Sequence, residues 1–423
     1  MTDLASFNPF DAETLQCPYP HYARMRDEAP VLHLESLGLY LVTRHDLVLS
    51  ILRDPTTFSS RFGRPTMPMA GDDARRLDAA IAEGYPRVPT MLTADPPDHT
   101  RFRGLVAKAF NARTTAAMEP FIRGLVTTLI DGWGGRDEIE FVGEFGVPLP
   151  VSVIATMLSQ PVERFGDIKR WSDASIAGIG TNLSVEERIA AERQTNEFQR
   201  HFAAELESRR LHPVDDLLSN LVHATIDEPG VDTRPLEMAE MLSIISQLMV
   251  AGNETTTKLL AEMMRLLGEH PDVWGRIGDD PTLVDRVVEE SLRMSSPTQG
   301  IFRIARADVV LDGVHVPKGA WLVLVYGSAN RDENVFADGD DFVPDRDRLK
   351  EHLAFGKGIH FCLGAALARL EARVALEELR ARITSFELDP SNDFRYIPSF
   401  MLRGLTRLDL HIQRAGSAVV SCD

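Results

Sequence analysis

One cysteine inside a glycine-rich loop constrains this 423-residue chain more than any other feature. The loop, residues 355–364 with the sequence FGKGIHFCLG, runs directly into a segment whose apolar residues recur at helical spacing. Cys362 is therefore predicted to lie at or just before a helix N-terminus, where free backbone N–H groups and the helix dipole favour a thiolate. Gly356, Gly358 and Gly364 leave room for a large flat group to approach the backbone.

A lone thiolate in this setting suits the axial ligand of a haem iron, where it pushes electron density toward cleavage of the O–O bond. The plain alternative is a buried, inert cysteine ahead of a core helix. The spacing Phe-x-x-Gly-x-x-x-Cys-x-Gly, which begins at Phe355, is far more specific than one cysteine. It resembles the haem-binding loop of the cytochrome P450 family, and three further motifs stand in the order found in that family.

The resemblance covers residues 11–411 and implies the fold of that family. This is a mainly α (α+β) architecture, in which a helical haem domain carries a smaller β region built from N-terminal, central and C-terminal strands. The residue patterns agree, because helical spacing dominates residues 98–294. Strand patterns stand at residues 31–42, 309–326 and 396–412.

No linker, repeat or change of composition divides the chain. We therefore expect one catalytic domain over residues 1–423, with a flexible tail at residues 415–423. Residues 59–89 mix Gly and Pro with polar residues, so we expect a long, adaptable loop with one helix, acting as a lid over the ligand site.

The formal net charge of −18 argues against nucleic acid as a partner. No run of 18 apolar residues predicts a membrane span, and the first residues lack the basic and apolar regions of a signal peptide. The three cysteines, Cys17, Cys362 and Cys422, are odd in number and far apart, which favours a reducing compartment over a disulfide framework. We expect a cytoplasmic monomer without a membrane anchor.

A second motif lies in the middle of a long helix predicted over residues 241–267. At 1.5 Å per residue this helix would span roughly 40 Å and cross the whole domain. Its centre reads AGNETTT from Ala251, and glycine followed by three β-branched residues is a poor choice for a helix interior. We expect a local opening of the hydrogen-bond ladder, which would let Thr255 and a water exchange bonds with the backbone.

The resemblance identifies this segment with the oxygen-activation motif of the family. It implies that Ala251 contacts the haem, that Thr255 holds a water chain near dioxygen, and that Glu254 relays protons from solvent. Both proton transfers need a positioned hydroxyl and a titratable group within hydrogen-bond reach. A tolerated glycine with threonines facing solvent is the structural alternative.

Glu290 and Arg293 stand three residues apart and share a face of a predicted helix. Alone, they would form an ordinary surface pair. Their place between the other two motifs resembles the family pattern. It implies a buried pair tied to residues 330–332 and 342–346, with a structural role in supporting the haem pocket.

Four basic residues are the expected partners of the haem propionates, which need cations or hydrogen-bond donors when partly buried. His99 and Arg103 share a helix face, and the resemblance adds Arg303 and His360. Each of the four has the alternative of being a solvated basic residue. The implied cofactor is haem b, and the resemblance adds contacts to it from Phe355, Gly356, Ala251 and Gly364.

The resemblance also implies a substrate pocket formed by the lid, the long helix, the segment after Pro297 and the last β turn. Those positions supply apolar side chains: Met67, Met69, Leu248, Met249, Ile301, Phe302, Phe400 and Met401. Gln299 is expected to give one hydrogen bond that orients the substrate. No arginine there is placed to hold a carboxylate, so a terpenoid, aromatic or steroid-like compound is favoured over a fatty acid.

Two stretches of the acidic chain carry basic residues without acidic neighbours. They contribute Arg101, Arg103, Lys108, Arg113, Lys357 and Arg369. We expect one basic face on which an acidic redox protein docks. Soluble bacterial members of the family usually take electrons from a ferredoxin and its reductase, so NAD(P)H would act only indirectly.

Three other functions remain open at this point. A haem-thiolate sensor would not need the Glu254–Thr255 pair, and peroxide-dependent enzymes of the same fold typically lack it. A thiol nucleophile or a zinc site at Cys362 would lack a second cysteine nearby and a recognisable Ser/His/Asp arrangement. A mono-oxygenase that inserts one oxygen atom of O2 into a hydrophobic substrate accounts for all the motifs together.

Overall fold

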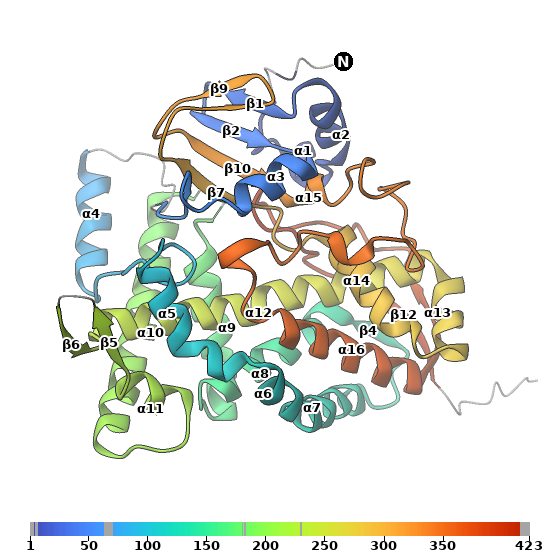
Figure 1. Cartoon of the computed structure of the whole chain (residues 1–423). Helices are drawn as coiled ribbons and strands as arrows, with labels where there is room; N and C mark the ends of the chain where they lie inside the picture. Colours follow the sequence, from blue (N-terminus) through green and yellow to red (C-terminus); the bar gives the residue numbers. More distant parts are fainter. Residues whose placement is uncertain are drawn as a thin grey trace, which may run out of the picture.

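The computed structural model describes residues 7–62, 71–179, 183–228 and 231–414, together with Leu4 and Thr181. A β region lies above a larger helical region, and one long helix, α12 (Met238–Glu269), crosses the helical region from side to side (Figure 1). This helix has 32 residues and spans roughly 48 Å. None of the described helices is long and apolar enough to cross a lipid bilayer.

A five-stranded sheet joins the start of the chain to its centre. Its order is β1 (Val31–Leu34), β2 (Leu39–Val42), β10 (Trp321–Val325), β7 (Gly300–Ala305) and β3 (Phe58–Ser59). The predicted N-terminal hairpin is confirmed, and β10 runs parallel to β2 and antiparallel to β7. Because β7 has a neighbour on each side, its residue Arg303 is fixed inside the sheet.

The C-terminal strands form a second, antiparallel sheet in the order β11 (Ile383–Leu388), β12 (Asp409–Arg414) and β4 (Glu138–Glu140). The prediction of a strand that starts at Tyr396 is wrong. Only a single bridge joins Tyr396 to Leu405. Pro398 has no N–H to donate to a ladder, so this stretch forms an irregular turn that the bridge closes.

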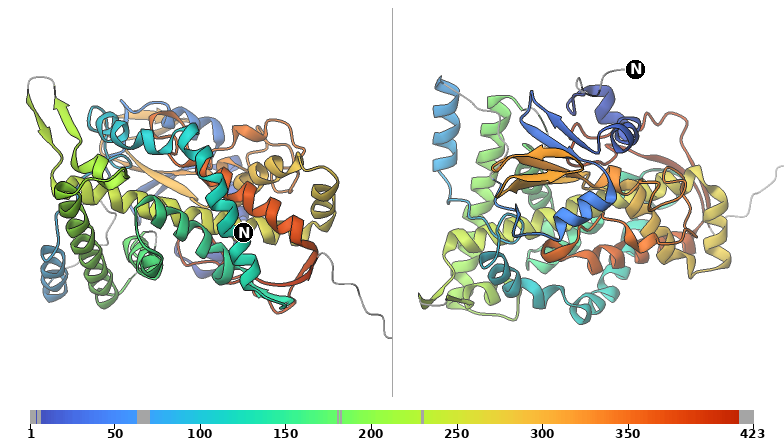
Figure 2. Two further views of the ribbon diagram at one scale, coloured as in Figure 1. Left: turned by 90° about the horizontal axis from the view of Figure 1, so that it is seen from below. Right: turned by 45° about the horizontal axis from the view of Figure 1, so that its top comes forward.

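The remaining elements surround α12. Two hairpins, β5 (Thr225–Glu228) with β6 (Val231–Pro235) and β8 (Val309–Leu311) with β9 (Val314–Val316), stand outside the sheets; the first projects from the body of the molecule (Figure 2). The other α-helices are α1 (Ala12–Gln16), α2 (Tyr19–Glu28), α3 (His45–Leu52), α4 (Gly71–Ala82), α5 (Asp98–Ala107), α6 (Ala112–Ala117), α7 (Glu119–Gly132), α8 (Pro148–Met157), α9 (Phe165–Ile176), α10 (Val185–Leu211), α11 (Leu217–Val222), α13 (Pro271–Asp279), α14 (Leu283–Ser295), α15 (Tyr326–Ala329) and α16 (Ala365–Arg382).

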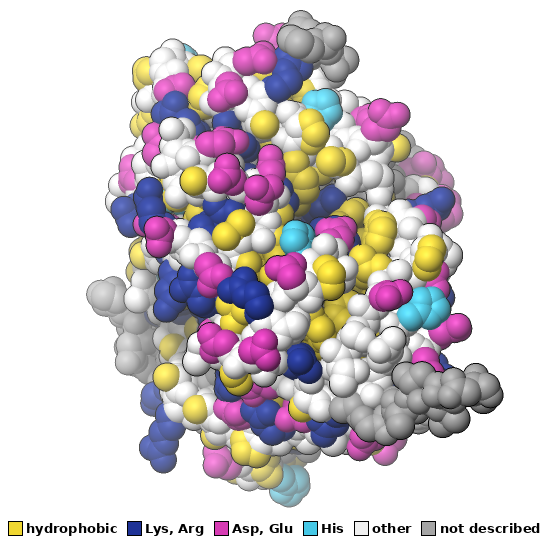
Figure 3. Space-filling view, turned by 90° about the vertical axis from the view of Figure 1, so that its right-hand side faces the viewer, with side chains coloured by type: hydrophobic (Ala, Val, Ile, Leu, Met, Phe, Trp, Pro, Cys, Tyr) yellow, Lys and Arg dark blue, Asp and Glu magenta, His cyan; other side chains and the backbone are white. Residues whose placement is uncertain are grey.

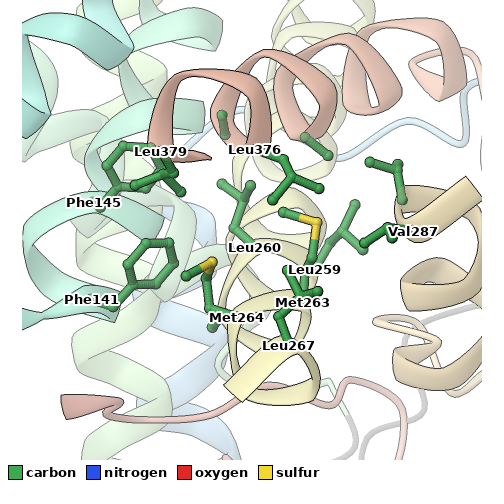
Figure 4. Close-up of a cluster of buried hydrophobic side chains, with 14 of the residues drawn as sticks. Phe141, Phe145, Leu259, Leu260, Met263, Met264, Leu267, Val287, Leu376 and Leu379 are labelled. Carbon is green, nitrogen blue, oxygen red and sulfur yellow. The ribbon is translucent and has the colours of Figure 1, made fainter. Parts of the chain in front are cut away.

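The largest hydrophobic core forms around the C-terminal half of α12. Figure 4 shows side chains that meet there from α12, α14, α16 and the segment before α8: Phe141, Phe145, Leu259, Leu260, Met263, Val287, Leu376 and Leu379. These side chains are almost completely buried, so they pack at the density of a protein interior. The core therefore holds the centre of α12 in a fixed position relative to α14 and α16, which carry two of the motifs.

The described part of residues 59–89 contains the one expected helix, α4, which lies beside α10 (Figure 1). Asn196 of α10 donates to the Ala80 carbonyl at 2.7 Å, and the Gln199 amide exchanges two hydrogen bonds with the Tyr85 backbone, at 2.7 and 3.0 Å. A Cβ at Gly84 would lie 2.2 Å from the Asn196 amide oxygen, so glycine leaves room for this contact. Side chains of α10 thus hold the end of α4 and the chain that follows it.

Candidate functional site

The cysteine loop is closed by its own backbone. The Cys362 N–H donates to the Phe355 carbonyl at 2.9 Å. Gly358 has a φ of +71°, and a Cβ there would lie 2.3 Å from the Leu52 carbonyl oxygen, so only glycine fits. The predicted position of the cysteine is confirmed, because α16 begins just after it with Gly364 as its N-cap.

The predicted thiolate needs a correction. Burial raises the pKa of the Cys362 thiol, and the Gly364 N–H and the charges of Arg103 and Arg369 oppose this shift only in part. The protein alone therefore favours the neutral thiol. A metal ion that binds the sulfur displaces its proton. The site fits a thiolate that forms on binding iron.

Two buried side chains near this loop have too few partners. Arg303 is 2% exposed, and Nη1 donates to the Phe302 carbonyl at 2.7 Å, while no carboxylate of the described residues lies within ion-pair distance of it. Both ring nitrogens of His99 are buried, and neither has a hydrogen-bond partner within the described part of the chain. Buried polar groups in native proteins are nearly always satisfied. These two residues therefore fit an anionic group such as a haem propionate.

The other two predicted propionate partners already have contacts of their own. His360 Nε2 lies 2.9 Å from Ser60 Oγ, and its ring centroid lies 4.3 Å from that of His99. Burial lowers the pKa of His360 to about 3, so this ring is neutral. Arg103 donates from Nη2 to the Phe361 carbonyl at 2.7 Å, which ties α5 to the cysteine loop.

The centre of α12 is a continuous helix, so the prediction of an open hydrogen-bond ladder is wrong. Thr255 Oγ1 donates to the Ala251 carbonyl one turn earlier, at 3.2 Å. Gly252 serves packing instead, since a Cβ there would lie 2.8 Å from Ile154 of α8. Ala251 is exposed although most of α12 is buried, so the face shared by Ala251 and Thr255 is not covered by protein atoms.

Glu254, which is 6% exposed, belongs to a chain of ionisable groups. Its carboxylate accepts a hydrogen bond from Lys258 Nζ at 2.7 Å and lies 3.5 Å from Lys169 Nζ. Lys169 of α9 also pairs with Asp173, whose side chain is half exposed. Burial favours the neutral acid, but the two ammonium groups outweigh burial and hold the pKa of Glu254 below its ordinary value. The chain of groups leads from the surface to the centre of α12.

Glu290 and Arg293 form an ion pair at 2.8 Å in which neither side chain is exposed. Arg293 also donates to the Asn330 carbonyl at 2.8 Å, and Glu290 accepts from the Val343 N–H at 2.9 Å. The Asn330 side chain accepts from the Leu353 N–H at 2.6 Å. The pair thus links α14 to the segment that leads into the cysteine loop, which is the arrangement that the resemblance implies.

The predicted basic residues divide into paired and free ones. Four have no acidic partner among the described residues: Arg103, which donates to the Phe361 carbonyl, and Lys108, Arg113 and Lys357. The prediction that Arg369 is unopposed is wrong, because its Nε and Nη2 both bind the Glu289 carboxylate, with Nη2 at 3.0 Å. Arg101 likewise pairs with Asp98 at 3.2 Å. On the face drawn in Figure 3, basic and acidic side chains are interspersed.

The predicted substrate residues differ in their burial. Met67 and Met69 lie outside the described residues. The Phe302 ring lies 6.4 Å from Phe400 and 5.7 Å from Phe62. Ile301 and Phe400 are partly exposed, whereas Leu248, Phe302 and Met401 are buried.

Two of the predicted substrate residues point elsewhere. Gln299 donates from Nε2 to the carbonyls of Ser295 and Ser296, at 3.2 and 2.8 Å. Its Oε1 lies against Gly327, where a Cβ would come within 2.2 Å of it. Its amide nitrogen therefore holds the local backbone, and its amide oxygen is buried without a hydrogen-bond partner among the described residues, so neither group is exposed to a substrate. Met249 is completely buried in the core between α12 and its neighbouring helices, on the side away from Ala251.

Sequence reasoning missed Gln247, which lies one turn before Ala251 on the same face of α12. Its Oε1 accepts from the Leu92 N–H at 3.1 Å, and its Nε2 donates to Thr90 Oγ1. The sequence could have indicated Gln247, because it stands four residues before Ala251 and eight before Thr255, which places all three on one helix face. Gln247 joins α12 to the segment that follows residues 59–89.

Comparison with known proteins agrees with this geometry. The family model for cytochrome P450 matches residues 151–407. Cytochrome P450 107B1 of Saccharopolyspora erythraea is 35% identical over 406 residues, which cover 94% of this chain and 96% of that protein.

Two solved structures show the same fold. Cytochrome P450 CYP109Q5 from Chondromyces apiculatus has a TM-score of 0.84 and 38% identity, covering 98% of this chain and all of that one. CYP109E1 from Bacillus megaterium, solved in complex with testosterone, has a TM-score of 0.82 and 33% identity, covering 95% of this chain and 99% of that one. The chain therefore belongs to the cytochrome P450 family, and it is a haem-thiolate mono-oxygenase.

Proposed function

We propose that this enzyme, as one catalytic domain and as a monomer, oxidises uncharged hydrophobic molecules of moderate size, with steroid-like and terpenoid compounds foremost. The observation that supports this proposal is that Ile301, Phe302 and Phe400 form an apolar wall of the proposed substrate pocket. The buried Arg303, which follows Phe302 in β7, is assigned to a propionate and is not available to a substrate carboxylate. The testosterone held by CYP109E1 supports a steroid-like ligand.

Cys362 would bind the haem iron, and His99 and Arg303 would hold the propionates. His99 offers its unpartnered ring nitrogens, and Arg303 offers its unpaired guanidinium. Arg103 and His360 would complete this set from the loop side, and further contacts would come from Ala251, Phe355, Gly356 and Gly364. Bound haem supplies the redox centre at which one oxygen atom of O2 enters the substrate and the other leaves as water.

Thr255 and Glu254 would manage the protons. The Thr255 hydroxyl, on the uncovered face of α12, would turn from the Ala251 carbonyl to a water. Glu254 would receive protons by way of Asp173 and Lys169 and pass them toward that water. Because Glu254 and Thr255 are consecutive on a helix, their side chains leave it about 100° apart, so the carboxylate must leave Lys258 to reach the water.

Electrons would come from NAD(P)H through a reductase and an acidic ferredoxin that docks near the cysteine loop. Lys108, Arg113 and Lys357 supply the free positive charges there; we call these three residues the proximal basic face. Arg103 fixes α5, which precedes Lys108, to the loop that carries Lys357. Charge complementarity of this kind speeds association and selects the partner.

The substrate class is tested by a binding screen that follows the haem absorption band. Testosterone and a cyclic terpene alcohol should displace the water bound to iron, whereas palmitate should not. Phe400→Ala should weaken testosterone binding about tenfold through lost apolar contact, while Gln299→Ala should not change the ligand preference. Tight binding of palmitate alone would show that the wall has been misread.

A further inference from the structure

Arg369 lies at the boundary between the interior and the surface. It stands on the second turn of α16, and its side chain is 36% exposed, whereas that of its partner Glu289 is 9% exposed. The guanidinium binds both oxygens of the Glu289 carboxylate. A carboxylate arriving from solvent would therefore meet Arg369 while Glu289 stays behind it.

The Arg369 side chain is also in contact with the cysteine loop. Its guanidinium carbon lies 4.5 Å from the centroid of the Phe355 ring, within range of a cation–π interaction. The Phe355 carbonyl in turn accepts the Cys362 N–H. A shift of Arg369 would thus change the contact that holds one end of the loop.

Glu289 has a second partner that does not depend on Arg369. His352 Nε2 lies 2.9 Å from Glu289 Oε2, and the Ala354 N–H donates to His352 Nδ1 at 3.2 Å. Since Nδ1 is an acceptor, Nε2 carries the proton and donates it to Glu289. Leaving a buried carboxylate bare is costly, and this hydrogen bond lowers that cost when Arg369 departs.

We propose that Arg369 exchanges its carboxylate partner when the electron donor docks: it binds Glu289 in the free enzyme and an acidic side chain of the donor in the complex, and the exchange reaches Cys362 through Phe355. This inference rests on the proposed docking of an acidic ferredoxin at the proximal basic face. The proximal basic face attracts the electron donor, and Arg369 responds when the donor has bound.

The first test compares the affinity of the holoenzyme variants for an acidic [2Fe–2S] ferredoxin at low salt and pH 7. Burial favours neutral Glu289, but His352 and Arg369 hold its pKa at about 2, so it stays ionised there. Glu289→Gln removes the internal competitor and should tighten binding roughly two- to fivefold, whereas Arg369→Gln should weaken it by a similar factor. The double variant should show no gain over Arg369→Gln. Glu377→Gln, on the same helix and paired with Arg123 and Arg373, is the matched control and should change nothing.

The second test reads the haem. Saturating ferredoxin should shift the haem absorption band and the reduction potential of the parent enzyme, and Arg369→Gln should lose most of this shift even when saturated. This second test does not use the Glu289→Gln variant, so it still decides the question if that variant fails to fold.

The outcomes separate the two proposals. If Lys108→Glu weakens docking but the Glu289 and Arg369 variants bind and shift like the parent, the exchange is wrong and the docking face stands. If Lys108→Glu and Lys357→Glu leave the affinity unchanged, the docking face and the exchange both fall.

Discussion

Two buried glutamate ion pairs, one on α14 and one on α12, use the same chemistry in different surroundings. Glu290 contacts Arg293 at 2.8 Å, and Glu254 contacts Lys258 at 2.7 Å. The Glu290 pair binds backbone groups from the chain between α15 and the cysteine loop. The Glu254 pair instead continues through Lys169 to the surface.

Burial alone does not decide whether an ion pair is a fixed support or part of a proton path. The Glu290 pair, whose other partners are backbone groups and the permanently charged Arg346, is a fixed support, because any movement would leave several buried groups unpaired. A pair with a further titratable neighbour has a path along which a proton can move. The first pair should therefore matter to stability, and the second to turnover.

The largest expected effect is the loss of the fixed support in Glu290→Gln. The amide would place N–H groups against the donors of Arg293 and Val343, so the free energy of unfolding should fall by about 3–5 kcal/mol. Urea unfolding and haem content measure this. Glu144→Gln, which breaks a surface pair with Arg136, should cost less than about 1 kcal/mol. Equal stability of the two variants would contradict the comparison.

Glu254→Gln should cost less stability than Glu290→Gln, because Lys258 Nζ still donates to the backbone carbonyl at position 254 and to the new amide oxygen. It should slow turnover on the order of 100-fold through loss of the titratable group. The solvent isotope effect on turnover should change as well. Asp173→Asn, one step nearer to solvent, should slow turnover less. A large loss of stability with unchanged turnover would reverse the roles assigned to the two pairs.

Thr255→Ala should keep haem content and substrate binding close to normal, while the product formed per NADH oxidised falls several-fold. The reason is that the hydroxyl holds a water and does not bind the iron. Thr256→Ala is the matched control, since Thr256 is buried on another face of α12. If coupling of NADH to product is the same in both variants, Thr255 has no such role.

The smallest effects concern the proximal basic face. Changing Lys108, Arg113 and Lys357 to Glu should lower the rate of electron transfer from ferredoxin without altering substrate affinity. The rate of the parent enzyme should fall steeply with salt, because the Debye length is about 8 Å at physiological ionic strength. Arg75→Glu, on α4, is the control for net charge. A rate indifferent to salt and to charge reversal would exclude this face.

The sequence predicted those features that depend on local spacing. The position of Cys362 before α16, the length of α12 and the Glu290–Arg293 pair all follow from residues close together in the chain. It did not predict partners that the fold brings from afar. Glu289 neutralises Arg369 across 80 positions, and Gly327 faces Gln299 because of the way β7 meets β10.

The sequence also did not predict the protonation state of Cys362. Spacing placed Cys362 at a helix start, which favours a thiolate, but burial by the completed fold raises the pKa of the thiol. The continuity of α12 has the same kind of origin. Glycine and threonine propensities favour an opening, whereas in the fold Ile154 packs against Gly252 and the helix is continuous.

The most direct test of the account is the absorption spectrum of the reduced enzyme under carbon monoxide. With Cys362 as the axial ligand, the parent enzyme should absorb near the position typical of thiolate ligation, and Cys362→Ser should lose that band while the protein still folds. Cys17→Ser, at an exposed cysteine, should leave the band unchanged. A Cys362→Ser variant that keeps the thiolate band would contradict the central assignment.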